Sequence, residues 1–401
     1  MPHDLVAVST NADWVERFRE WDNSQSTNRR RNVPLILSGH GMGLRINNGA
    51  LEARNGFTHY PQKREITRIF LGDRNAPSRI VMLGGSGAIT LDVLSWLADQ
   101  NIPLVQLDYR GNVVTAIGHS GLGHDPALAR LQLDQSRSEP QALEIGAWLI
   151  RKKLLASRET MIACLPDSDL RKRADACVTE AINQLGRPWE LSKNALLGLE
   201  GKCALFYFEA WRTVPVKWKG TSRKPIPESW SSIGFRRGEN NHSNRFARHP
   251  VQAMVNYGYA VVESLIRIEV SKVGLDLTVG FLHRSRYERP ALIMDLLEPI
   301  RPVVDRVILD LVRSNSFSPM DFVITTDGTV RLHPQLGRAL VARIGTPAAI
   351  RPLIASFLAK IGFNQSAVDP AKGQTWMAQR ALKGYAIGVH DRKRGRRVDV
   401  D

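Results

Sequence analysis

The sequence predicts an α+β fold, in which an N-terminal β-strand-rich domain is followed by a larger all-α domain. Two observations predict this division. Up to Gly123 the chain reads as short alternating runs separated by turn residues, whereas beyond Gly123 apolar residues recur at three- and four-residue spacing. With 401 residues the chain is long enough for two or three domains with cores of their own. We place the first boundary between residues 122 and 123.

The strand-rich part begins with a hairpin. Asn48 and Gly49 separate two runs of alternating apolar residues, and Asn-Gly favours a tight turn because both central residues take positive φ. Further strands are predicted within residues 64–73, 79–85, 102–108 and 113–118, and an amphipathic helix from about Thr90 to Asp99 lies among them.

The helical part contains four long patterns. The first covers residues 126–162, with Pro140 as a break or a helix start, and the second covers residues 193–212. The third, residues 250–273, opens with a proline and is followed by Gly274, which are common start and stop signals. The fourth covers residues 292–312.

The charge balance indicates a polyanionic partner. Lys and Arg number 55 against 39 Asp and Glu, which gives a net charge of +16. The N-terminus shows no signal-peptide pattern and no apolar run is long enough to span a bilayer, so nucleic acid is favoured over a membrane surface. The three cysteines, Cys164, Cys177 and Cys203, show no C-x-x-C spacing, which argues against a disulfide framework and favours a reducing cytoplasm.

A basic segment between the second and third helices is the first candidate for nucleic-acid binding. Cations that neutralise phosphates alternate there with Trp218, Trp230 and Phe235, whose rings can stack on bases. The alternative is a solvated loop whose aromatic residues pack locally. The candidate DNA-binding cations of this loop, residues 213–249, are Lys217, Lys219, Arg223, Lys224, Arg236, Arg237, Arg245 and Arg248.

A glycine-rich turn, Gly84 to Gly87, suggests a dinucleotide-binding unit at first sight. A predicted strand precedes it, a helix follows, and the next strand ends in Asp108. The G-x-G-x-x-G pattern fails, however, because Thr90 stands where the third glycine belongs. A single such unit in a hairpin-rich region is weak support for nucleotide binding.

Acidic residues on apolar helix faces are the most informative feature. Glu200 lies in the stripe formed by positions 196, 200, 203, 207 and 211, and Asp295 and Glu298 share a helix face among Leu and Ile. A buried carboxylate needs a compensating cation, which is either a metal ion or a basic side chain. For Glu200 alone a salt bridge is the favoured interpretation. Together with His283, the acids form a plausible oxygen-and-nitrogen site for Mg²⁺ or Mn²⁺.

Five segments resemble the CRISPR adaptation integrase family, in the family's order and across roughly residues 34–340. They are GGSGAITLDVLSWLADQNIPLVQLDYRGNV, LLGLEGKCALFYFEAW, VNYGYAVVES, GLDLTVGFLH and LIMDLLEPIRPVVD. The chain differs from the family pattern in an N-terminal extension (residues 1–33), the long basic loop, a basic C-terminal extension (residues 346–401) and GLDL in place of GLDP.

The resemblance implies an N-terminal β domain, residues 1–122, that dimerises, and a helical catalytic domain, residues 123–345. Residue by residue, it implies that Glu200, His283 and Glu298 are metal ligands and that Asp295 is a catalytic acid that supports them. It also places Asn256, Tyr257 and Tyr259 on a helix near the site, with DNA contacts expected for Asn256 and Tyr259; core packing is the alternative for both tyrosines.

The implied activity is that of an endonuclease and integrase. A metal-activated 3′-hydroxyl of spacer DNA would attack a phosphodiester of a CRISPR repeat, with double-stranded DNA, a second copy of the chain and a small dimeric adaptor protein as partners. The alternatives are a transposon-borne or stand-alone relative with the same chemistry and a non-catalytic DNA-binding scaffold.

Overall fold

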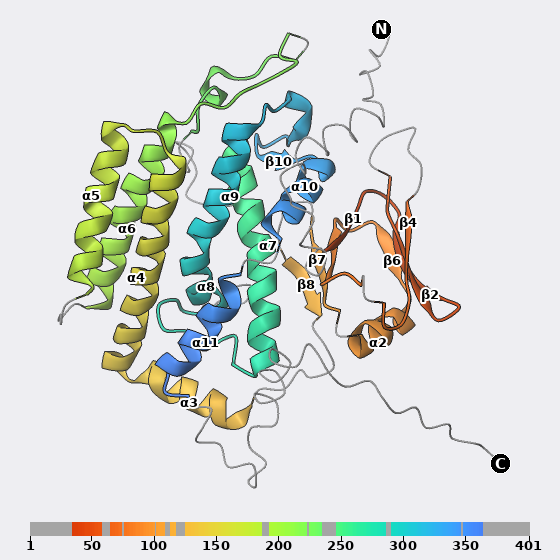
Figure 1. The fold of residues 1–401 in the computed structure, drawn as a ribbon, viewed down its shortest axis with the longest axis horizontal. Helices are drawn as coiled ribbons and strands as arrows, with labels where there is room; N and C mark the ends of the chain where they lie inside the picture. The colour runs from red at the N-terminus through yellow and green to blue at the C-terminus, as the bar shows by residue number, and fades with distance from the viewer. Residues whose placement is uncertain are drawn as a thin grey trace.

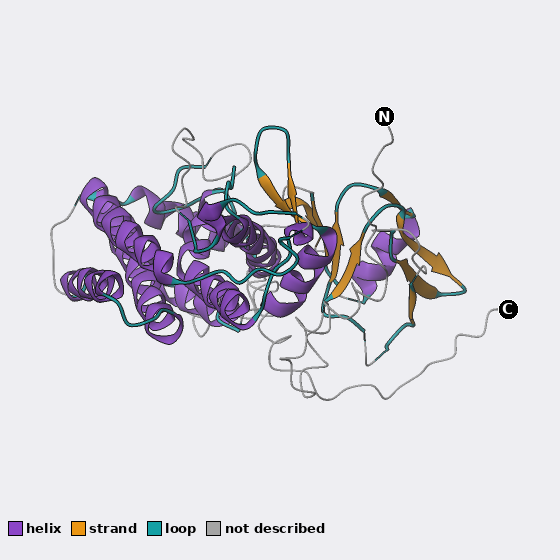
Figure 2. Cartoon of the chain, turned by 90° about the horizontal axis from the view of Figure 1, so that it is seen from above, coloured by secondary structure: helices purple, strands orange, loops and turns teal. Residues whose placement is uncertain are grey.

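The computed structural model describes residues 34–57, 65–73, 76–100, 102–108, 113–117, 125–186, 192–222, 224–234, 246–285, 290–345 and 348–363. Its N-terminal strands gather at one side and its long helices at the other (Figures 1 and 2), as an α+β fold with N-terminal strands requires. The boundary expected near residue 122 lies outside the described residues.

Two four-stranded sheets form the N-terminal part. One has the order β1-β5-β7-β8 and the other the order β4-β3-β2-β6. The strands are β1 (Leu35–Ser38), β2 (Met42–Asn47), β3 (Ala50–Arg54), β4 (Ile66–Ile69), β5 (Ile80–Leu83), β6 (Gly87–Ile89), β7 (Leu104–Leu107) and β8 (Val113–Ile117). Helix α2 (Leu91–Asp99) starts after Thr90, close to the predicted position.

The predicted hairpin is confirmed. Strands β2 and β3 pair antiparallel around a turn in which Asn48 has φ 50° and Gly49 φ 74°. The glycine-rich turn is not a phosphate cradle of the dinucleotide type. Strand β6 separates Gly84 and Gly85 from helix α2, so no helix N-terminus follows the glycines directly.

The sheet β1-β5-β7-β8 is shared between the two parts of the molecule. Along β5 the side chains alternate: Val81 and Leu83 pack into the core of the helical part, and Ile80 and Met82 pack into the core of the strand-rich part. Helix α7 (Pro250–Val273) lies against strand β8 and against the neighbouring helices (Figure 1). The helical part is therefore built directly on one face of this sheet.

The four predicted segments are helical, and the helices Asp169–Gln184 and Pro334–Ile344 were not predicted. The helices of this part are α3 (Pro126–Arg137), α4 (Glu139–Cys164), α5 (Asp169–Gln184), α6 (Lys193–Ala210), α7, α8 (Ala291–Leu297), α9 (Arg301–Ser314), α10 (Pro334–Ile344) and α11 (Ile350–Lys360), with short 3₁₀ turns η1 (Trp211–Thr213), η2 (Glu228–Trp230), η3 (Glu298–Ile300) and η4 (Pro319–Asp321). Pro140 stands in the first turn of α4, so it starts a helix. None of the described helices is long and apolar enough to cross a bilayer.

Two details differ from the expected division. The helical part is not all-α, because β9 (Phe322–Ile324) and β10 (Val330–Leu332) form an antiparallel hairpin within it. Residues 346–401 are also not a basic extension from their start: helix α11 buries Ile350, Leu353, Ile354, Phe357 and Leu358 in the helical core. The sequence pattern missed this helix because its apolar face is short and lies beside a strongly basic tail.

The described part of the basic loop is folded against the helical part. Single bridges join Pro215 to Ser232 and Trp218 to Phe317. The rings of Trp218 and Trp230 stack on each other with centroids 5.6 Å apart, and Trp218 also meets the rings of Phe317 and Phe322. The interpretation of these two tryptophans as base-stacking rings is therefore wrong, since the rings stabilise the loop itself. Phe235 lies outside the described residues.

Candidate active site

Helices α4, α6 and α9 and the turn η3 bring two of the predicted acids, Glu200 and Glu298, together with two basic residues. Lys153 comes from α4, Glu200 from α6, Glu298 from the first position of η3 and Arg301 from the start of α9. Helix α4 contacts α6, η3 and α9. Residues that are far apart in the sequence therefore meet at one place on the inner side of the helical part.

Glu200 and Glu298 share one lysine. The Lys153 Nζ lies 2.6 Å from Glu298 Oε2, and the same ammonium donates to Glu200 Oε1. Arg301 binds the other oxygen of Glu298 at 2.7 Å. The side chains of Glu298 and Lys153 are 6% and 13% exposed, so water screens these pairs weakly.

The basic neighbours keep Glu298 ionised. Burial raises the pKa of this carboxyl, but Arg301 and Lys153 outweigh burial and lower the pKa to about 2. In the same way, burial lowers the pKa of Lys153, but Glu298 and Glu200 raise it by more, so that the pKa of the ammonium lies above its usual value. Glu298 and Lys153 are therefore both charged at neutral pH.

Asp295 fixes the position of His283. Asp295 is fully buried, and its Oδ1 accepts from the backbone N–H of His283 at 3.0 Å and lies 2.7 Å from His283 Nδ1. Its Oδ2 accepts from the backbone N–H groups of Phe281 (2.5 Å) and Leu282 (3.1 Å). A carboxylate bonded to one ring nitrogen leaves the other nitrogen, Nε2, to act as a ligand, which is a common arrangement around metal-binding histidines.

The donor types of Glu200, Glu298 and His283 suit a divalent cation, although in this structure the two carboxylates bind the ammonium of Lys153. Two carboxylates and one imidazole favour Mg²⁺ or Mn²⁺, and His283 is close enough to Glu298 for its charge to lower the pKa of that carboxyl. Within the described residues, however, no group of three or more His, Cys, Asp or Glu side chains is arranged around a common point. Lys153 occupies the position between Glu200 and Glu298 instead. The salt bridge favoured for Glu200 from the sequence is therefore present.

A cavity of about 640 Å³ opens beside the cluster. Lys153, Glu200, Tyr259 and Arg301 line it, together with apolar side chains of α4 and α6. Arg301 lies over the ring of Tyr259, 5.2 Å from its centroid. The charged cluster is thus accessible to a ligand from the surface.

The two tyrosines of the α7 motif have different positions. Tyr259 lines the cavity, and its hydroxyl donates to the buried Asp305 at 2.6 Å, an acid that also accepts from Tyr207. Tyr257 packs against Gly337 in the core, as the packing alternative predicts. Asn256 is half-buried on the same helix.

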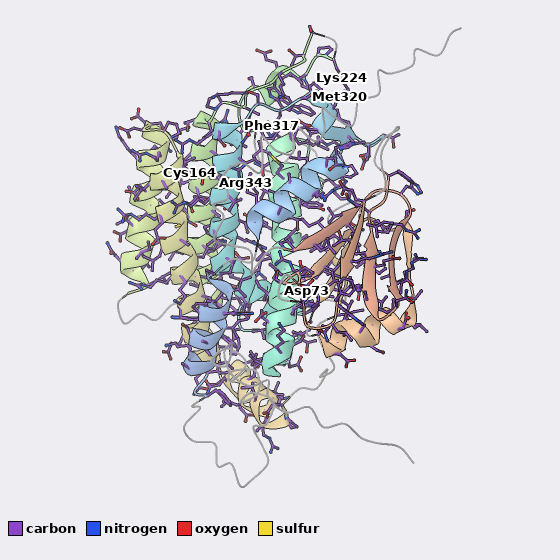
Figure 3. The ribbon with its side chains drawn as sticks, turned by 45° about the vertical axis from the view of Figure 1, so that its right-hand side comes forward. Asp73, Cys164, Lys224, Phe317, Met320 and Arg343 are labelled. Atoms are coloured by element: carbon purple, nitrogen blue, oxygen red, sulfur yellow. The ribbon has the colours of Figure 1, made fainter. Side chains whose placement is uncertain are left out.

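The candidate DNA-binding cations are only partly described. Lys217, Lys219, Lys224 and Arg248 are exposed on or next to the basic loop, and Figure 3 shows Lys224 at the end of the molecule where this loop lies. Four further candidates lie outside the described residues: Arg223, Arg236, Arg237 and Arg245.

Sequence reasoning missed Lys153 and Arg301. The signal for Lys153 was available, because it falls between Leu149 and Ser157 at four-residue spacing in the buried stripe of α4. This is the same kind of signal that singled out Glu200, namely a charged residue on an apolar face. Arg301 stands three residues after Glu298, at the spacing that brings two side chains together on a helix.

Comparisons with known proteins show the family of the chain. The family model of "CRISPR associated protein Cas1" matches residues 73–345, more than half of the chain. The chain is 27% identical over 300 residues to "CRISPR-associated endonuclease Cas1 1" of Archaeoglobus fulgidus. The aligned region covers 72% of this chain and 80% of the relative.

Two solved structures share the fold. A casposase bound to integration product has a TM-score of 0.66 at 19% identity, covering 88% of this chain and 99% of the casposase chain. A Cas6-RT-Cas1–Cas2 complex has a TM-score of 0.56 at 17% identity, covering 90% of this chain and 35% of the other.

Proposed function

The chain belongs to the CRISPR-associated protein Cas1 family, and we propose that it is a divalent-metal-dependent DNA integrase. Its reaction would be a transesterification, in which a 3′-hydroxyl end of spacer DNA attacks a phosphodiester bond of a CRISPR repeat. The family supports an endonuclease or integrase role in CRISPR adaptation. The observation that carries the finer proposal is that Glu200 and Glu298 meet at Lys153 beside a cavity, while His283, oriented by Asp295, is close enough to Glu298 to lower the pKa of that carboxyl.

Glu200, Glu298 and His283 are the residues that would hold the metal. A bound Mg²⁺ or Mn²⁺ would supply Lewis-acid activation of the 3′-hydroxyl and stabilise charge on the attacked phosphate. The buried Glu298 stays anionic because of its low pKa, so it is a permanent ligand at neutral pH. Asp295 holds the imidazole of His283 in one orientation through its Nδ1.

Cations at the cavity and on the basic loop would position the DNA. Arg301 lines the cavity, and the exposed Lys217, Lys219, Lys224 and Arg248 lie on or beside the basic loop. Contacts of this type go to phosphates, so binding would depend strongly on salt concentration and weakly on sequence. With a net charge of +16, the chain has the electrostatic character such binding needs. Asn256 and Tyr259 are proposed to contact DNA nearer the cavity.

The proposed partners are double-stranded DNA, a second copy of the chain and a small adaptor. The structural relatives include a casposase bound to an integration product and a complex that contains Cas1 and Cas2. We propose a Cas2-like dimer as the adaptor and the N-terminal strand-rich part as the dimer contact. A transposon-borne integrase with the same chemistry is the second candidate, and the likeness to the casposase fold favours it over a non-catalytic scaffold.

The test is strand transfer of a short 3′-hydroxyl duplex into plasmid DNA in the presence of Mn²⁺. Glu200→Gln removes one negative charge and keeps the shape of the side chain, and Glu180→Gln, on an exposed position of α5, is the matched control. Joining by the wild type and by Glu180→Gln, but not by Glu200→Gln, supports the proposal. Equal joining by all three proteins would remove Glu200 from the mechanism.

A missing partner is tested in the same assay. If the wild type joins no DNA, the Cas2-like adaptor is added. Absence of joining in its presence, with intact DNA binding, would leave the non-catalytic scaffold as the function.

A further inference from the structure

Lys153 is placed where a metal ion bound by both glutamates would lie. Its ammonium contacts Glu200 Oε1 and Glu298 Oε2, each of which belongs to a carboxylate proposed as a ligand. The side chain of Lys153 is 13% exposed, and that of Glu200 is 20% exposed. Any cation that binds both carboxylates directly therefore competes with this ammonium for the same oxygens.

The two basic residues of the cluster have different roles. Arg301 binds Glu298 Oε1, whereas Lys153 binds Glu298 Oε2. Among the described residues, only Lys153 forms ion pairs with both carboxylates. Two carboxylates brought close together repel each other unless a cation lies between them, so Lys153 also holds the ligands at a short separation in the metal-free protein.

The cavity offers space for the ammonium of Lys153 once it leaves the two carboxylates. Lys153 lines the cavity of about 640 Å³, as do Glu200 and Arg301. The lysine side chain is a flexible chain with a point charge at its end, so a rotation about its side-chain bonds moves the charge without moving α4. Helix α4 itself is fixed by the buried residues on either side, Ile150 and Leu154.

We propose that Lys153 is an internal counterion that occupies the metal position in the free protein and that a divalent cation displaces its ammonium into the cavity. This inference rests on the proposed function, because it takes Glu200 and Glu298 as metal ligands. Lys153 is thus a positioning residue: it keeps the ligands together before the metal binds, and it lowers the affinity for the metal. The exchange makes or breaks no covalent bond.

The experiment is a titration of the full chain with Mn²⁺, with free Mn²⁺ followed by electron paramagnetic resonance. Lys153→Met keeps a long side chain but removes the competing charge, so Mn²⁺ should bind about tenfold more tightly, or more, than to the wild type. The control is Lys152→Met, because Lys152 lies over the ring of Trp148 outside the cluster. It should bind Mn²⁺ as the wild type does.

The other outcomes overturn the inference in different ways. Equal or weaker Mn²⁺ binding by Lys153→Met, with clear binding by the wild type, refutes the displacement and leaves the proposed metal site intact. Absence of Mn²⁺ binding in all three proteins refutes the metal site, and the displacement with it.

A second measurement uses only the wild type, so it tests the proposal even if Lys153→Met does not fold. An acetylating reagent that attacks amines is applied with and without saturating Mn²⁺, and the acetylation of Lys153 relative to Lys152 is measured by mass spectrometry. Displacement predicts faster acetylation of Lys153 when Mn²⁺ is bound. An unchanged ratio means that the ammonium stays on the carboxylates, which contradicts the proposal.

Discussion

Substitution of Asp295 by asparagine tests whether the Asp295 carboxylate stabilises the segment around His283 and orients its imidazole. The carboxylate of Asp295 is fully buried and accepts from the backbone N–H groups of Phe281, Leu282 and His283, besides its contact with His283 Nδ1. In Asp295→Asn one of the two oxygens becomes an NH₂ group. With Nδ1 of His283 as a donor, either orientation of the amide places its NH₂ group against two donors, so two of the four contacts are lost.

The structure sets the magnitude of the effect. A hydrogen bond to a charged acceptor contributes about 1.5–3 kcal/mol, and a buried donor without a partner costs a similar amount. We expect Asp295→Asn to lower the free energy of unfolding by about 3–5 kcal/mol and Tm by about 5 °C. Because the imidazole of His283 is no longer oriented, Mn²⁺ affinity should fall by about 10–100-fold.

The assay is thermal denaturation followed by circular dichroism in the absence of metal, with Mn²⁺ binding measured separately. Asp276→Asn is the matched control: Asp276 accepts from the backbone N–H and the hydroxyl of Thr278 near the surface, where water replaces the lost contacts. This variant should lose less than about 1 kcal/mol. A Tm for Asp295→Asn equal to that of the control would refute the role given to the Asp295 carboxylate.

Two further predictions concern packing and pH. A Cβ at Gly280 would lie 2.5 Å from the Cβ of Ala291 and 2.9 Å from an oxygen of Asp295, so Gly280→Ala should destabilise the protein by about 1–3 kcal/mol. Gly198→Ala, on α6 with nothing within 4 Å of the added methyl, should instead raise stability by about 0.5–1 kcal/mol; the same sign of change in Tm for both variants would contradict this argument. Burial lowers the pKa of His249 from 6.5 to about 4, so the unfolded chain binds the proton first and stability is lost as the pH falls from about 6.5 towards 4, by up to about 3 kcal/mol. His249→Asn keeps an acceptor for the N–H of Val251 at the start of α7. Urea denaturation of this variant should show a smaller loss of stability between pH 6.5 and pH 4 than the wild type shows. If the variant loses as much stability as the wild type, groups other than His249 cause the pH dependence.

Local patterns in the sequence predicted most of the fold. The Asn48-Gly49 turn, the helix after Thr90 and the helix from Pro250 to Gly274 were predictable because each depends on neighbouring residues: positive φ at a turn, a helical period, and a proline or glycine at a helix end. Helices α5, α10 and α11 and the β9–β10 hairpin were missed. For α10, α11 and the hairpin the reason is that short elements carry a weak periodic signal and owe their stability to packing.

The candidate site was predicted in part. A charged residue on an apolar helix face is visible in the sequence, and this signal, with the family resemblance, selected Glu200, Asp295, His283 and Glu298. Their roles as ligands remain a proposal. The sequence did not indicate what lies opposite each charge, because an apolar stripe shows that a position is buried and not which side chain it meets there.

The sequence by itself determined the strand-rich start, the helical remainder, the positive charge and the family. Only the tertiary structure decided that Lys153 lies between Glu200 and Glu298 and that Asp295 orients His283. It also decided that Trp218 and Trp230 stabilise the basic loop by stacking on each other. The physical reason is that periodicity and turn preference act between neighbours along the chain, whereas ion pairs and ring contacts depend on how the helices pack, which brings Lys153 of α4 to an acid 145 residues further along the sequence.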